Sequence, residues 1–576
     1  MTWVQDYQPA GGLWFSALLA ALPILVLLVA LGVIRWSAHL SAALALITAL
    51  GVALLLYRMP AGLAFDAAAM GVVFGVWSVA WIAFHAVYFH NVTVATGRFD
   101  SIKRVLAGFS EDRRLQALLI AFAFGALLEG VAGGGSPIAI TAAMMAALGF
   151  PPVKAVVLAL LANTAPVAFG GLGNPLIVLG RLTAPIMHLK QDQATDLFSS
   201  MVGRQVPILA LIIPAFLVVV LAGWKKMLEV WPAVLTAGVA FAVMQYVASN
   251  FISPSLVDVL AALTAMAALW ILTRFWQPAS VWRFDDEEPV KEGASLGAAK
   301  VDARRRTPSR GGEVQHSALY AWMPYIILIL AIFLSRIGTI FKNLPAWLDL
   351  TKLLHKADWI FAWPGLHNRV IQHPPITAKN APYAANLTVD FLFSPGTIAL
   401  FAAIVAGFAM GAKPGLLIAT YRKTLFQMRW ALATIFMILG IAFVMNYSGA
   451  TQTLGLALAT TGAVFPLFSA YIGWLGVFLT GSDASTNSLF GPMQVISAQQ
   501  LGVNPILAGA TNTSGGVMGK MISPQNLSIG ATAIGQSGKE GSLLRQTFLW
   551  SFVLTGVVGV ISLLQATILT AMIPTP

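Results

Sequence analysis

The chain has 576 residues, of which 58% are hydrophobic and only 10% are charged. Charged residues make up roughly 25% of soluble proteins, so this composition excludes a soluble globular domain and indicates an integral membrane protein. Lysine and arginine outnumber aspartate and glutamate by 34 to 22. We attribute this excess to cytoplasmic loops, where basic residues gather, and not to nucleic-acid binding. The absence of cysteine excludes disulfides and thiolate metal sites.

Long hydrophobic runs follow one another along the chain. At about 20 residues per crossing they predict about 12 transmembrane helices. The runs are apolar on every face, unlike the alternating strands of an outer-membrane barrel, so we predict an all-α polytopic membrane protein. They lie near 13–34, 38–57, 67–89, 115–128, 137–149, 154–170, 205–222, 232–249, 256–273, 320–340, 397–412, 430–445, 453–479 and 547–573.

Basic residues predict which ends of these helices are cytoplasmic. The loop 97–114 carries five lysines and arginines. The positive-inside bias therefore places this loop in the cytoplasm and the N-terminus outside. The pair Lys225 and Lys226 falls inside by the same count.

A charged stretch at 275–318 divides the chain. It contains a run of four acids followed by a proline, a composition typical of solvated linkers. We predict a cytoplasmic linker between an N-terminal transmembrane half, 1–274, and a C-terminal half, 319–576. The polar segment 342–394 falls outside the membrane on the other side, and its histidines are spaced too irregularly to predict a metal site.

The two halves share an interrupted motif. An apolar run gives way to small and polar residues at 125–137 and again at 476–487, and an Asn-Thr pair follows each break. Broken backbone at membrane depth survives only where protein or a water-filled cavity surrounds it. Broken helices at matching positions are typical of transporters with two inverted-topology repeats, so we predict re-entrant hairpins that mark the binding site. The alternative is that the small residues only permit close helix packing.

The polar residues at these breaks are the candidate site. Asn and Thr offer donors to a carboxylate or oxygens to a cation, and helix N-termini attract anions. The predicted substrate-binding residues are Ser136, Asn163, Thr164, Ser482, Ser485, Asn512, Thr513 and Lys520.

Three of the candidate residues are charged, and a charge at mid-membrane costs about 2.5–3.5 kcal/mol even on lenient scales. Glu129 and Asp483 occupy nearly matched positions in the two halves. We predict that one of them carries a proton, and we favour Glu129 because it lies deeper in its apolar run. Lys520 is expected to pair with an anionic substrate or with Asp483, and the alternative is a buried pair that only locks the fold.

Several motifs resemble those of the lactate permease family. They are Leu128-Glu129-Gly130-Val-Ala-Gly, Ala162-Asn163-Thr164-Ala-Pro, Thr480-Gly481-Ser482-Asp483 and Gly519-Lys520-Met-Ile-Ser523-Pro524, and the resemblance extends over nearly the whole chain. It implies a multi-pass carrier of the bacterial inner membrane that takes up L-lactate by proton symport, along with D-lactate, glycolate and similar 2-hydroxymonocarboxylates. Gly134 departs from the family pattern, which has Phe there.

The sequence also leaves alternatives to a proton-coupled lactate carrier. A sodium-coupled carboxylate symporter of the same architecture is the alternative, since Asn-Thr hairpins also coordinate Na⁺. A channel would lack saturable, gradient-driven accumulation. No H-E-x-x-H or G-x-S-x-G motif is present, so we expect no enzyme, no catalytic residues and no cofactor. The expected partners are a small monocarboxylate, protons and the lipid bilayer, with a homo-oligomer left open and no nucleic acid.

Overall fold

The computed structural model describes residues 2–34, 36–284, 318–341, 344–345 and 347–575. Most of the predicted linker 275–318 therefore lies outside the described residues. The helices of the first half are α1 (Leu13–Ala20), α2 (Leu22–Leu28), α3 (Ala38–Gly51), α4 (Ala61–Phe74), α5 (Trp81–Ala95), α6 (Arg98–Ala107), α7 (Arg113–Ala117), α8 (Gly125–Val131), α9 (Ser136–Ala147), α10 (Pro152–Ala162), α11 (Gly170–Met187), α12 (Gln191–Val202), α13 (Val206–Ala222), α14 (Trp224–Leu228), α15 (Trp231–Phe251) and α16 (Val257–Phe275).

The second half is also mainly helical. Its helices are α17 (Ala318–Ser335), α18 (Ile337–Ile340), α19 (Leu350–His355), α20 (Pro395–Ala409), α21 (Pro414–Ser448), α22 (Ala450–Ala459), α23 (Phe465–Thr480), α24 (Asp483–Leu501), α25 (Pro505–Gly519), α26 (Pro524–Ala533) and α27 (Glu540–Thr567). Shorter helical turns that matter below are η4 (Leu118–Phe124), η5 (Val167–Phe169) and η8 (Lys520–Ile522).

The predicted polytopic helical fold is confirmed. Within the described residues, nine helical segments are long and apolar enough to cross a membrane, and two bent helix pairs raise this number to 11. Helices α9 and α10 have only 12 and 11 residues, too few to cross a bilayer alone. They pack against each other as a short hairpin, the form expected of a re-entrant segment.

Five short strands supplement the helices. β1 (Trp3–Val4) pairs in parallel with β3 (Val370–Gln372), and β3 pairs with β4 (Ala381–Pro382). The other sheet joins β2 (Asp358–Ala362) to β5 (Asn386–Asp390) in antiparallel register. Pairing of β1 with β3 places the N-terminus and the polar segment 342–394 on the same side of the molecule.

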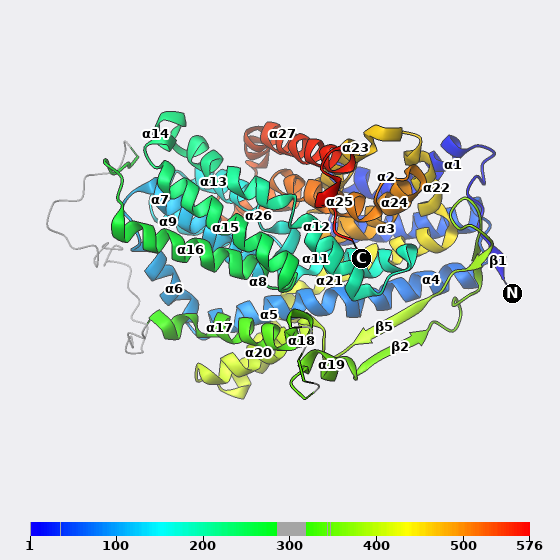
Figure 1. Cartoon of the computed structure of the whole chain (residues 1–576), viewed down its shortest axis with the longest axis horizontal. Helices are drawn as coiled ribbons and strands as arrows, with labels where there is room; N and C mark the ends of the chain where they lie inside the picture. Colours follow the sequence, from blue (N-terminus) through cyan, green and yellow to red (C-terminus); the bar gives the residue numbers. More distant parts are fainter. Residues whose placement is uncertain (1, 35, 285–317, 342–343, 346, 576) are drawn as a thin grey trace.

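The two ends of the molecule differ in the residues they carry. Figure 1 shows β1 and the β2–β5 pair at one end and α14 at the other. Helix α14 holds Lys225 and Lys226. This is the arrangement that the positive-inside prediction requires.

Both predicted helix breaks are present in the structure. Three glycines between α8 and α9, Gly133 to Gly135, have φ of +59°, +64° and +83°, a region that side chains with a Cβ rarely adopt. Gly481, between α23 and α24, has φ +69°. A further break lies at 171–173 near the start of α11, where all three residues are left-handed.

The two halves are interlocked and do not stand apart as separate units. Helix α11 packs against α24, α12 against α25, and both α3 and α4 against α21. The largest buried cluster of apolar side chains draws on both halves. Breaks from one half therefore meet helices of the other near the centre of the molecule.

Within the second half, α23 and α25 pack closely through small residues. A Cβ on Gly473 would overlap the carbonyl of Asn512, and one on Gly515 or Gly519 would overlap the carbonyl of Ala470 or Trp474. Small residues let helix backbones approach closely in membranes. Glycine at these three positions therefore allows α23 and α25 to pack closely.

We expect Gly473→Ala to destabilise the protein by about 3 kcal/mol or more, because the obstacle to the added methyl group is backbone that cannot rotate away. Thermal unfolding of the purified variant measures the effect. Gly415→Ala is the matched control, since a Cβ there meets no atom within 4 Å. Equal melting temperatures for the two variants would contradict the close packing of Gly473 against the backbone of α25.

Candidate substrate and proton site

Glu129 lies at the centre of a buried polar site. Its Oε1 accepts a hydrogen bond from Lys520 Nζ at 2.5 Å, and its Oε2 accepts one from Asn163 Nδ2 at 2.9 Å. All three residues are at most 4% exposed. The contact joins the first half of the chain to the second, as the breaks in each half suggested.

The two donors occupy equivalent positions in their helices. Asn163 directly follows the last residue of α10, and Lys520 directly follows the last residue of α25. Helix C-termini carry partial negative charge, which favours a cation such as Lys520. Glu129 belongs to the last turn of α8, beside the glycine break. Three helix ends thus deliver one acceptor and two donors to the same point.

Asp483, one of the two partners expected for Lys520, lies near this pair but is not bonded to Lys520. It is the first residue of α24, and its Oδ1 would stand 2.6 Å from a Cβ on Gly516, one turn before Lys520. It interacts electrostatically with both Lys520 and Glu129. Neither carboxyl oxygen has a hydrogen-bond partner among the described residues.

Asp258 is a third buried carboxyl at this site, which the sequence analysis missed. It lies in the first turn of α16 and is 1% exposed. Its Cβ would stand 2.7 Å from a Cβ on Gly130, the neighbour of Glu129. As with Asp483, neither of its oxygens has a partner in the described part of the chain.

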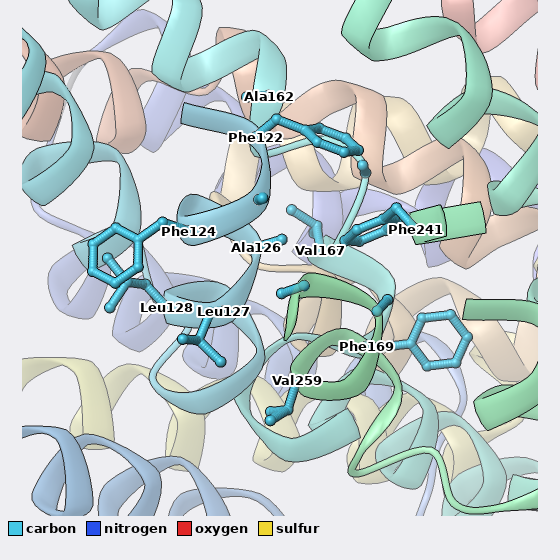
Figure 2. Close-up of a cluster of buried hydrophobic side chains, with 14 of the residues drawn as sticks. Phe122, Phe124, Ala126, Leu127, Leu128, Ala162, Val167, Phe169, Phe241 and Val259 are labelled. Carbon is cyan, nitrogen blue, oxygen red and sulfur yellow. The ribbon is translucent and has the colours of Figure 1, made fainter. Parts of the chain in front are cut away.

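Apolar side chains enclose the first-half part of the site. Figure 2 shows a cluster of Phe122, Phe124, Ala126, Leu127, Leu128, Ala162, Val167, Phe169, Phe241 and Val259. Three members are direct sequence neighbours of site residues: Leu128 of Glu129, Ala162 of Asn163 and Val259 of Asp258. The polar groups are therefore held in a low-dielectric setting, where charge–charge interactions are strong.

Asn512 and Thr513 lie in a different polar cluster. Asn512 Nδ2 and Thr513 Oγ1 both donate to Asn487 Oδ1, at 2.8 and 3.0 Å, and Gln494 Nε2 donates to Asn512 Oδ1 at 2.5 Å. Both residues sit inside α25 and not at its end, about 10–12 Å from Lys520 along the helix axis. The Asn-Thr pairs of the two halves are thus not equivalent in the structure, where Lys520 takes the place that Asn163 has in the first half.

The remaining predicted residues make local contacts. Thr164 Oγ1 donates to the Leu161 carbonyl, and Ser482 Oγ accepts the backbone N–H of Ser485 at the start of α24. Ser136 is half-buried at the first position of α9. These side chains shape the helix ends, and no hydrogen bond found among the described residues joins them to the Glu129–Lys520 pair.

The chain was compared with known proteins. A family model described as L-lactate permease matches residues 16–569. The chain belongs to the L-lactate permease family. This permease is 42% identical to the glycolate permease GlcA of Escherichia coli, with full coverage of both chains. It is 41% identical to the L-lactate permease of the same species and 39% identical to that of Bacillus subtilis, with at least 99% of this chain and all of each relative covered.

Family membership and the apolar helices identify a multi-pass transporter of the bacterial inner membrane. The solved structure of Neisseria gonorrhoeae MtrF is a distant likeness, with 13% identity and a TM-score of 0.44 over 85% of this chain and 82% of that one.

Proposed function

We propose that this permease takes up L-lactate by proton symport, and that D-lactate, glycolate and similar 2-hydroxymonocarboxylates share the site. One observation carries the proposal: the Glu129 carboxylate occupies Lys520 and Asn163, the cation and the amide that a substrate carboxylate would use. Relatives named as lactate and glycolate permeases support the substrate class.

Protonation of Glu129 provides the coupling. An ionised Glu129 holds Lys520 and blocks the substrate carboxylate, whereas a neutral Glu129 attracts the ammonium only weakly. Lactate then takes the place of Glu129 at Lys520. The new pair of Lys520 and lactate again has one positive and one negative charge. Proton and lactate cross together as a neutral unit, so a low-dielectric interior never holds an unpaired anion.

The 2-hydroxyl group also has an acceptor available. Asn163 Oδ1 is buried and has no partner among the described residues. It can accept the hydroxyl hydrogen while the Nδ2 of the same amide donates to the carboxylate. Glycines line this part of the site, since a Cβ on Gly170 would stand 2.6 Å from Glu129 Oε1. This favours small substrates.

Sodium coupling is the second candidate, favoured by the unpaired oxygens of Asp258, Asp483 and Asn163. Uptake of radiolabelled L-lactate into proteoliposomes separates the two. With an imposed inward pH gradient and no Na⁺, the proton mechanism predicts accumulation. A requirement for Na⁺, with no response to the pH gradient, would overturn it.

Asn163→Ala should weaken lactate binding roughly 10- to 150-fold, because a hydrogen bond to a carboxylate contributes about 1.5–3 kcal/mol. Isothermal titration of lactate into purified protein measures the dissociation constant. Asn512→Ala is the matched comparison: it removes bonds to Asn487 and Gln494, so we expect lower thermal stability with a smaller change in affinity. A larger loss of affinity in Asn512→Ala than in Asn163→Ala would place the substrate at the polar cluster of Asn487, Gln494 and Asn512.

A further inference from the structure

Asp258 has no role in the exchange described above, although it is buried beside it. The Glu129 carboxylate has two donors, whereas neither oxygen of Asp258 has any in the described part of the chain. Burying an ionised carboxylate without hydrogen bonds is far less favourable than burying the neutral acid. The N-terminal dipole of α16 favours the ionised form only modestly.

The charges around Asp258 also favour its neutral, protonated form. Of the elements packed against α16, α8 contributes Glu129, η4 has no titratable side chain, and the one titratable residue of α15, Tyr246, is 41% exposed. Lys520 also interacts with Asp258, but its ammonium is already bound to Glu129. Asp483 also interacts electrostatically with Lys520, so three buried carboxyls share one ammonium, and ionising all three there is strongly unfavourable.

We propose that Asp258 is the proton donor to Glu129, holding a proton beside the pair and passing it on when lactate binds. The inference rests on the proposed proton symport. The proton leaves a carboxyl oxygen of Asp258 and binds a carboxylate oxygen of Glu129, which releases Lys520 to the substrate. Asp258 becomes the anion and takes a new proton from water on the side from which lactate entered. One proton still crosses with each lactate.

The packing of α16 places Asp258 beside the segment that carries Glu129. Asp258 packs against Gly130, and any side chain at 130 would overlap its Cβ. The tight contact keeps the Asp258 carboxyl next to the end of α8 that carries Glu129. Asp258 is thus a positioning and proton-supplying residue, whereas Glu129 sets the stoichiometry.

Asp258→Asn tests the proposal in proteoliposomes. Net lactate uptake driven by a pH gradient should slow by about tenfold or more, since a positioned proton donor is lost. Exchange of labelled for unlabelled lactate at equal pH should stay near the wild-type rate, and the final accumulation should be unchanged because Glu129 is intact. Asp66→Asn, a change at a half-buried acid of α4, is the control. Infrared spectra of the purified protein should lose a protonated-carboxyl band in Asp258→Asn only.

Three results would overturn the relay: unchanged net uptake, an unchanged infrared band, or loss of the accumulation itself. Should Asp258→Asn fail to fold, Asp258→Ser, which is smaller than the native residue and cannot carry a carboxyl proton, takes its place. Failure of the proposed symport is separate, because wild-type protein would then show no accumulation driven by the pH gradient.

Discussion

Glu129→Gln is expected to abolish concentrative lactate uptake while leaving lactate exchange intact. The amide imitates a permanently neutral carboxyl, so Lys520 and Asn163 are always free for the substrate and no proton is needed to release them. In wild-type protein each unit of pH gradient supports about tenfold accumulation, since one unit corresponds to about 1.4 kcal/mol. In the variant this ratio should fall to unity.

Radiolabelled counterflow and pH-driven uptake in the same proteoliposomes separate the two activities. Glu540→Gln, which neutralises an acid at the start of α27 far along the chain from the site, is the matched control. Lactate uptake by Glu129→Gln should also respond to the membrane potential, because lactate now crosses as an anion. The potential contributes about 2.3 kcal/mol per charge for each 100 mV. Accumulation retained in Glu129→Gln would show that another acid carries the proton.

Lys520→Met should eliminate lactate binding, because it removes the cation that neutralises the substrate carboxylate. The same change leaves Glu129 buried without a counter-charge, a loss expected to cost about 3–5 kcal/mol of stability. Lys520→Arg should rescue only part of the activity, since a planar guanidinium differs in shape from an ammonium group. Lactate titration and thermal unfolding measure the two effects.

The double variant Glu129→Gln/Lys520→Met distinguishes binding from locking. Removal of both charges should restore stability toward that of wild type, since no unpaired charge remains. Lactate binding should stay absent, because the cation is still missing. A stable double variant that transports lactate would mean that the pair only locks the fold, the alternative raised by the sequence.

Much of this architecture was predictable from sequence because it depends on local composition. Long apolar runs specify membrane helices whatever their partners, and glycines at 133–135 and 481 can adopt the left-handed backbone of a break. Glu129 and Lys520 were recognisable because a charge within an apolar segment has a high cost. The strands at 358–390 were not predicted, since they are only two to five residues long, too short for a period-two pattern to stand out.

Which residues contact one another was harder to predict from the sequence. Lys520 was expected to meet Asp483 or the substrate, but it bonds to Glu129, because interlocking of the halves brings the ends of α8 and α25 together. Asn512 resembles Asn163 in its sequence neighbours, yet its helix continues past it for two further turns. Asp258 did carry a signal: it is the one acid within the predicted span 256–273.

The most direct test of the central claim is proton uptake on lactate binding. Purified wild-type protein in weakly buffered solution near neutral pH should take up about one proton for each lactate bound, because Glu129 must be neutral when the substrate holds Lys520. Glu129→Gln should bind lactate without taking up a proton. Lactate binding to wild-type protein with no proton uptake, or equal uptake in the variant, would contradict the exchange of Glu129 for substrate at Lys520.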